Sequence, residues 1–93
     1  MAITVKFVGA LRHSAGKDTR VVDCGECSVK ELIFTLTRRK PELRRNLIYE
    51  EFGESRPNAL ILVNGREISV LKGYETKLSD GDEIVFVPVV HGG

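Results

Sequence analysis

The sequence lacks tryptophan, contains one methionine and three prolines, and has only two cysteines, Cys24 and Cys27. Two cysteines cannot build the dense disulfide framework of small secreted domains. A dominant charge is also missing, because 14 lysines and arginines are balanced by 13 aspartates and glutamates, for a net charge of +1. A chain this close to neutrality lacks the field that gathers nucleic acid or an anionic membrane surface, so we expect neither partner.

Long apolar runs are absent as well. No stretch approaches the roughly 20 residues that a membrane-spanning helix needs. The first ten residues, MAITVKFVGA, include a lysine and alternate like a strand, whereas a secretory signal has an unbroken apolar segment. The sequence therefore predicts a cytoplasmic protein that does not insert into a membrane.

The composition that remains is that of an ordinary globular chain, with 42% hydrophobic and 29% charged residues in a length of 93. This length suits one domain, residues 1–93, and leaves no room for a second. Residues 88–93 are expected to form an extended C-terminal tail of that domain.

Alternating apolar residues predict strands at residues 3–8 and 19–24, joined by a glycine-bounded loop over 9–18. The segment ALILVNGREI, residues 59–68, is a strong strand–turn–strand signal. Its Asn64-Gly65 pair tolerates the positive φ angles of a type I′ hairpin turn. The segment EIVFVPVV, residues 83–90, predicts a last strand that is apolar on both faces, which is typical of a central strand.

One helix is predicted over residues 28–40. Ser28 and Glu31 have the spacing of a capping box, in which each side chain bonds a backbone N–H of the other residue. Pro41 is expected to end this helix, and 41–57 is predicted to be a partly helical connection. The element order is then β-β-α-β-β-β, an α+β fold in which one helix covers one face of a mixed sheet.

The end of the chain carries a resemblance to a known family. The turn DGDE at 80–83, the apolar strand after it, Pro88 and the final Gly92-Gly93 resemble the ubiquitin-like β-grasp proteins that carry sulfur. These are the small subunit of molybdopterin synthase (MoaD), the thiamine sulfur carrier (ThiS), and the ubiquitin-related and archaeal small modifier proteins. The resemblance spans the whole chain and implies a ubiquitin-like β-grasp with a mixed five-stranded sheet and one main helix on one face. The chain is longer than ThiS-like proteins, and its HGG ending is similar to that of the ubiquitin-related modifiers.

The resemblance implies that the reacting group is the α-carboxylate of Gly93. An ATP-dependent activating enzyme (MoeB-like) would adenylate it, and sulfur would then replace AMP to give a thiocarboxylate. The chain would bind no cofactor, and it would be a sulfur donor rather than a catalyst by itself. Gly92 has no Cβ and lets the tail enter a narrow active site. Pro88 removes a backbone donor where the tail leaves the sheet, and His91 is predicted to be either a recognition contact or, less simply, a catalytic base.

Two functions follow from the resemblance. The chain is either the sulfur-carrying small subunit of molybdopterin synthase, in complex with the large subunit (MoaE-like), or a protein modifier joined through Gly93 to target lysines, with a role in tRNA thiolation as an addition. A third interpretation, from the residues alone, is a redox or zinc module built on Cys24 and Cys27, which have the CGEC spacing of such sites. A structural zinc site needs four ligands, so we expect no metal here and two cysteines that the carrier chemistry does not use.

Two further expectations concern the last strand. Val85 and Val87 alternate away from Ile84 and Phe86, and Val8 alternates away from Phe7 on the first strand. Because the first and last strands lie side by side in this fold, these three valines are predicted to form an apolar docking surface beside the tail. The alternative is that the 41–57 connection covers this face. The tail itself is expected to be mobile from about Val89 onward.

Overall fold

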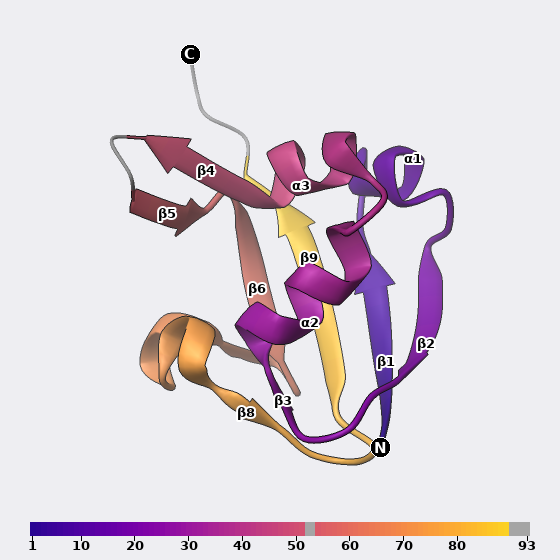
Figure 1. The fold of residues 1–93 in the computed structure, drawn as a ribbon, viewed down its shortest axis with the longest axis vertical. Helices are drawn as coiled ribbons and strands as arrows, with labels where there is room; N and C mark the ends of the chain where they lie inside the picture. The colour runs from indigo at the N-terminus through magenta and orange to yellow at the C-terminus, as the bar shows by residue number, and fades with distance from the viewer. Residues whose placement is uncertain (52–53, 90–93) are drawn as a thin grey trace.

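The computed structural model describes residues 1–51 and 54–89 of the chain (Figure 1). Its centre is a five-stranded mixed sheet with the strand order β2-β1-β9-β6-β7. β1 and β9 are parallel, and the other neighbours in this sheet are antiparallel. The strands are β1 (Ala2–Phe7), β2 (Thr19–Asp23), β6 (Ala59–Val63), β7 (Arg66–Glu67) and β9 (Glu83–Pro88). The predicted five-stranded β-grasp is confirmed, with the last strand at its centre.

The remaining elements surround this sheet. Three α-helices are α1 (Leu11–Ala15), α2 (Val29–Thr37) and α3 (Pro41–Leu47), and two 3₁₀ helices are η1 (Ile68–Val70) and η2 (Gly73–Glu75). Two small antiparallel pairs are formed by β3 (Cys27–Ser28) with β8 (Lys77–Leu78), and by β4 (Ile48–Glu51) with β5 (Glu54–Pro57). In Figure 1, α2 crosses in front of β9 and β1, and α3 and β4 lie on the same side.

The main helix begins where the sequence predicts. The Ser28 hydroxyl accepts from the Glu31 N–H at 3.3 Å, and the Glu31 carboxylate accepts from the Ser28 N–H at 3.1 Å, so the capping box is present. The helix ends earlier than predicted, at Thr37 rather than at 40. Pro41 does not simply stop it but opens α3 at the first helical turn, where a missing N–H costs nothing.

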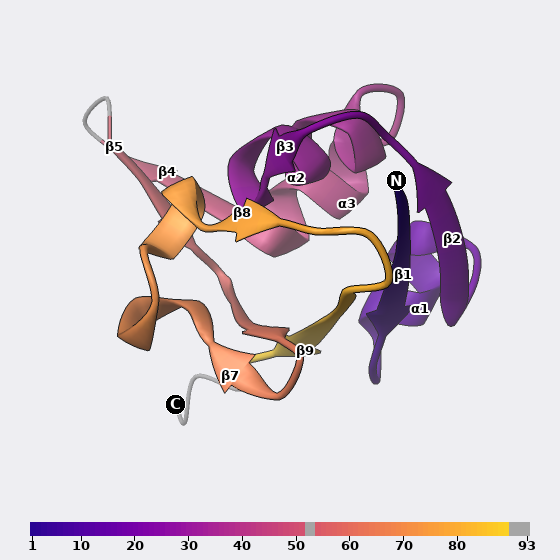
Figure 2. The same cartoon turned by 90° about the horizontal axis from the view of Figure 1, so that it is seen from below.

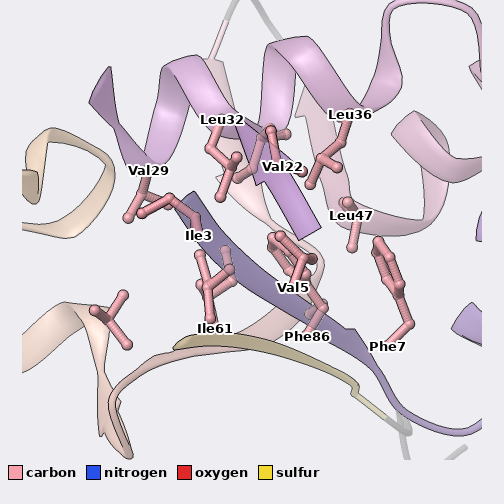
Figure 3. Packing of buried hydrophobic residues seen from close by; sticks show 14 of the residues in the cluster. Ile3, Val5, Phe7, Val22, Val29, Leu32, Leu36, Leu47, Ile61 and Phe86 are labelled. Atoms are coloured by element: carbon pink, nitrogen blue, oxygen red, sulfur yellow. The ribbon is translucent and has the colours of Figure 1, made fainter. Parts of the chain in front are cut away.

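One apolar core lies between the helices and the sheet (Figure 3). Phe7 and Phe86, on the adjacent parallel strands, stack with ring centroids 5.6 Å apart. The apolar face of α2 packs above them through Leu32 and Leu36, both almost fully buried. Leu47 reaches the same cluster from α3, so both helices bury their apolar sides against the same face of the sheet.

The DGDE turn joins three parts of the sheet. Asp80 Oδ1 accepts from the Ala2 N–H at 2.7 Å, at the start of β1. Asp82 Oδ1 accepts from the Asn64 side-chain Nδ2 at 2.9 Å, and the Asn64 side-chain Oδ1 accepts from the Glu83 N–H at 2.9 Å. The turn therefore fixes the start of β9 against both of its neighbours, β1 and the β6–β7 hairpin. Asn64 and Gly65 have φ angles of 50° and 83°, as the predicted hairpin turn requires.

Two segments differ from the prediction. The segment 9–18, predicted to be a loop, contains the one-turn helix α1, because Leu11 and Ala15 are four residues apart and both are buried. Gly16 closes this helix at φ 79°. The connection 41–57 is a complete helix followed by the β4–β5 hairpin, so it is more regular than predicted.

Candidate functional site

The base of the predicted tail is held by a close contact at the end of β9. Gly9 follows β1 with φ 61°, and a Cβ at this position would lie 3.2 Å from Pro88 Cγ. Pro88 is the last residue of β9 and pairs with Ala59 on β6. The domain therefore ends at a defined point, in a contact that only glycine fits without strain. His91, Gly92 and Gly93, which carry the predicted chemistry, lie outside the described residues, and so does most of the segment predicted to be mobile.

The three predicted docking valines come together on the face of the sheet opposite α2. The Val8 N–H donates to the Phe86 carbonyl oxygen at 3.1 Å, which places Val8 beside the last strand. Its side chain is 43% exposed, while Val85 and Val87 are half-buried. Ile84 and Phe86 alternate to the other face and are fully buried.

The sequence reasoning missed two further members of this surface, Leu60 and Leu62 on β6. In the antiparallel pairing of β6 with β9, Leu60 lies opposite Val87 and Leu62 lies opposite Val85. Leu60 is 39% exposed. Their signal was present in ALILV, where Ala59, Ile61 and Val63 occupy the buried face and the two leucines alternate away from it. We call the surface formed by these side chains the outer patch: Val8, Leu60, Leu62, Val85 and Val87.

Neither the helices nor the β4–β5 hairpin cover the outer patch. In Figure 2, α2, α3, β4 and β5 all lie on the same side of the sheet strands β1, β9 and β7. The described parts of the 41–57 connection, residues 41–51 and 54–57, therefore do not cover the patch as the alternative predicted, and Leu43 and Leu47 of α3 are buried in the core on the helix side. A salt bridge of 3.1 Å between Lys6 and Glu83 lies at the rim of the patch, because both side chains point to the same face.

The two cysteines lie at the opposite end of the sheet from Pro88. Their Sγ atoms are 3.1 Å apart and both thiols are free. Burial, followed by the hydrogen bond with Cys24, raises the pKa of the Cys27 thiol to about 12. Among residues 1–51 and 54–89, no group of three His, Cys, Asp or Glu side chains is arranged to hold a metal ion. In that same part of the chain, no helix has the length and apolarity to cross a membrane.

Curated relatives match the chain over its full length. The small archaeal modifier protein 3 of Haloferax volcanii is 33% identical over 96 residues, covering 100% of both chains. The ubiquitin-related modifier 1 of Schizosaccharomyces pombe is 44% identical over 99 residues, again covering 100% of both.

Solved structures share the fold. The small archaeal modifier protein 1 of Methanosarcina acetivorans superposes with a TM-score of 0.82 at 30% identity, over 99% of this chain and 96% of that one. A Pyrococcus furiosus protein described as a putative molybdopterin converting factor, subunit 1, superposes with a TM-score of 0.75 at 26% identity. The match covers 97% of this chain and 99% of that one. A chain in the crystal structure of the BexX/CysO complex of Amycolatopsis orientalis superposes with a TM-score of 0.76 at 27% identity. The match covers 99% of this chain and 100% of that one.

A family model extends this similarity to the tail. The model of the ThiS family matches residues 5–93, which includes the outer patch, Pro88 and the final glycines. The chain therefore belongs to the ThiS family, and its fold and relatives are those of the ubiquitin-like sulfur carriers and modifiers.

Proposed function

We propose that this protein is a sulfur carrier whose Gly93 α-carboxylate is adenylated by an ATP-dependent activating enzyme and then converted to a thiocarboxylate. The observation that carries the proposal is the match to the ThiS family through residue 93. The chain itself binds no cofactor in this scheme, because ATP is a substrate of the activating enzyme.

The chemistry explains why a partner is needed. A carboxylate is a poor acyl donor, because its leaving group would be an oxide. In the first step a Gly93 carboxylate oxygen attacks the α-phosphorus of ATP, and pyrophosphate leaves. In the second step a sulfur nucleophile attacks the carbonyl carbon, and AMP leaves with the bonding electrons. Gly92 and Gly93 suit both steps, because backbone without Cβ atoms passes close to the walls of an active site.

The geometry at the end of β9 supports a mechanism in which this chain supplies the Gly93 carboxylate and the partner enzyme catalyses the reaction. Gly9 and Pro88 fix the point where the chain leaves the sheet. From Pro88 to Gly93 an extended chain reaches on the order of 20 Å. A partner that binds the folded domain next to Pro88 can therefore receive Gly93 in an active site some distance away.

We assign the binding of the partner protein to the outer patch. Five apolar side chains form one continuous surface on β9, on β6 and on Val8, which directly follows β1. Val8, Leu60 and Val87 lie nearest to Pro88. A contiguous apolar surface of this kind on a small domain usually marks a protein–protein site. Because one patch lies beside one tail, the activating enzyme and the sulfur acceptor bind in turn rather than together.

Two acceptors are supported by different relatives. The Pyrococcus furiosus structure supports the large subunit of molybdopterin synthase (MoaE-like), with the thiocarboxylate passing its sulfur to a pterin precursor. The identity of 44% to a ubiquitin-related modifier, together with the match to an archaeal modifier, supports lysine side chains of target proteins, with Gly93 forming an amide. Both acceptors require the same activated Gly93.

Co-expression with a MoeB-like activating enzyme separates the two acceptors. A tagged chain that serves only as a carrier accumulates as free thiocarboxylate and forms no covalent conjugates. A chain that serves as a modifier also yields lysine-linked conjugates that survive reduction and denaturation. A variant lacking Gly92 and Gly93 is the matched control, because it retains the outer patch. Thiocarboxylate or conjugates formed by that control would contradict the assignment to Gly93.

A further inference from the structure

The segment CGEC, residues 24–27, brings two thiols together in a place that the proposed carrier chemistry does not use. It connects the end of β2 to β3 and α2, at the end of the sheet near the N-terminus, whereas the chain leaves the sheet at the other end (Figure 1). The two Sγ atoms are 3.1 Å apart. A disulfide bond is about 2.0 Å long, so the two sulfur atoms need to approach each other by roughly 1 Å for the bond to form.

The backbone on both sides holds this arrangement. The Cys24 N–H donates to the Met1 carbonyl oxygen at 2.9 Å, which fixes Cys24 to the start of β1. Cys27 pairs with Leu78 in the β3–β8 ladder, directly before the Ser28 cap of α2. The two thiols are therefore held close together by backbone contacts on both sides of the pair, and not only by the short connection between them.

The exposure of the pair is asymmetric. Cys24 is half-buried, and Gly25 and Glu26 between the cysteines are exposed, with open space around Gly25. Cys27 is 7% exposed. A reagent from solution therefore reaches Cys24 first, and Cys27 meets only what is already attached to Cys24.

We propose that Cys24 and Cys27 are a redox modification site, which forms a reversible intramolecular disulfide by exchange with a disulfide from solution. This inference does not rest on the proposed carrier function. It requires only that the two thiols react in sequence.

The exchange balances in two steps. The Cys24 thiolate attacks one sulfur of the external disulfide, a mixed disulfide forms, and the other sulfur leaves as a thiolate that takes up a proton. Cys27 then loses its proton and attacks Cys24 Sγ, and the second external sulfur leaves as a thiol. Two protein thiols are oxidised to one disulfide, and one external disulfide is reduced to two thiols. Burial, followed by the hydrogen bond with Cys24, raises the pKa of Cys27, which disfavours Cys27 as the first nucleophile and leaves that place to the more exposed Cys24.

The disulfide ties the end of β2 to the start of α2 and leaves the outer patch unchanged. Closing a four-residue loop removes conformational freedom from the unfolded chain. The chain-entropy model predicts that the disulfide raises the ratio of folded to unfolded protein by roughly twentyfold. Oxidation is thus expected to stabilise the domain without altering the surface next to Pro88.

The test uses the full chain, reduced and freed of reductant, in glutathione buffers that run from fully reduced to fully oxidised. Samples are quenched in acid, free thiols are alkylated, and the intact mass is recorded. We expect a monomer that loses two hydrogens and takes up no alkylating agent, with dithiothreitol restoring both thiols. The oxidised form should also melt at a higher temperature than the reduced form. A product that remains a glutathione adduct or a cross-linked dimer, or two thiols that stay alkylatable in oxidised glutathione alone, would overturn the proposal.

Two single variants test the order of attack. Cys27→Ser should accumulate a stable mixed disulfide between Cys24 and glutathione. Cys24→Ser leaves only the buried thiol and should react at least about tenfold more slowly. Equal rates in the two variants, with native circular dichroism in both, would refute the assigned order, and the wild-type mass measurement stands even if a variant fails to fold.

Discussion

At the scale of single residues, Gly9 has the tightest surroundings of the glycines that the structure describes. Its φ of 61° and the 3.2 Å distance from an added Cβ to Pro88 Cγ mean that alanine meets both backbone strain and a tight contact with the proline ring. We predict that Gly9→Ala destabilises the protein by roughly 1–2 kcal/mol, the usual cost of left-handed backbone for a residue with a Cβ. Chemical denaturation measures it.

Gly25→Ala is the matched control for that substitution. Gly25 has no atom within 4 Å of an added Cβ, and it is not among the glycines with positive φ. Its replacement should change the unfolding free energy by no more than about 0.5 kcal/mol. Equal losses at the two positions would mean that the Gly9–Pro88 contact does not constrain the end of β9.

The cysteines give a second prediction at this scale. Cys24→Ser combined with Cys27→Ser should leave adenylation of Gly93 at the wild-type rate, because the pair lies at the far end of the sheet from Pro88. Pyrophosphate release with a MoeB-like enzyme measures this. If a double variant with a native circular dichroism spectrum lost adenylation, the two cysteines would have to take part in the activation of Gly93.

At the scale of elements, the capping box of α2 governs an acid dependence. The Ser28 backbone N–H, and then its hydroxyl, hold the pKa of Glu31 below its usual range. The folded state therefore favours the carboxylate. Its contribution to stability is complete above the pKa of Glu31 in the unfolded chain and is lost as the pH falls through the lowered folded value.

Thermal melts at several pH values check this dependence. Glu31→Gln keeps a side-chain acceptor for the Ser28 N–H but does not titrate, so the stability difference between wild type and this variant should shrink on acidification. Ser28→Ala should cost about 1 kcal/mol at neutral pH through loss of the cap. A difference between wild type and Glu31→Gln that stays constant from neutral pH to below the ordinary glutamate range would refute the role of the carboxylate.

Some helices and turns could be predicted from the sequence, and others could not. The capping box located the start of α2, and the Asn64-Gly65 pair located the β6–β7 turn, because both depend on local hydrogen bonds or backbone angles. The helix α1 was missed, because Leu11 and Ala15 provide only two apolar positions, and their burial depends on distant parts of the chain. The boundary between α2 and α3 was misplaced, because a proline is equally suited to follow one helix or to begin the next.

At the scale of the whole molecule, the site combines residues from three strands. Val8, Val85 and Val87 were predictable, because alternation and the expected adjacency of the first and last strands place them on one face. The alternation in ALILV places Leu60 and Leu62 on the exposed face of β6, but their position beside Val87 and Val85 depends on the pairing of β6 with β9, which the sequence alone does not specify. The tail chemistry was inferred from the resemblance, and Gly92 and Gly93 lie outside the described residues.

A charged substitution in the outer patch tests whether this surface binds the activating enzyme. Val87→Asp should leave the protein folded at a cost on the order of 1 kcal/mol, since the side chain is half-buried on a central strand. Binding to the activating enzyme should weaken by about tenfold or more, because the interface would bury an unpaired charge. Val70→Asp is the control, as Val70 is 74% exposed in η1 and outside the patch. Normal binding by a folded Val87→Asp protein would place the docking surface elsewhere.

The central claim is that the Gly93 carboxylate is the reacting group, and the intact mass of the purified chain tests it most directly. The chain is incubated with a MoeB-like activating enzyme, ATP and a sulfur donor, beside a variant that lacks Gly92 and Gly93. We expect the wild-type mass to rise by the exchange of one oxygen for sulfur, fragmentation to place the change on Gly93, and the truncated variant to stay unchanged. An unchanged wild-type mass, under conditions in which the same enzyme activates its own carrier, would contradict it.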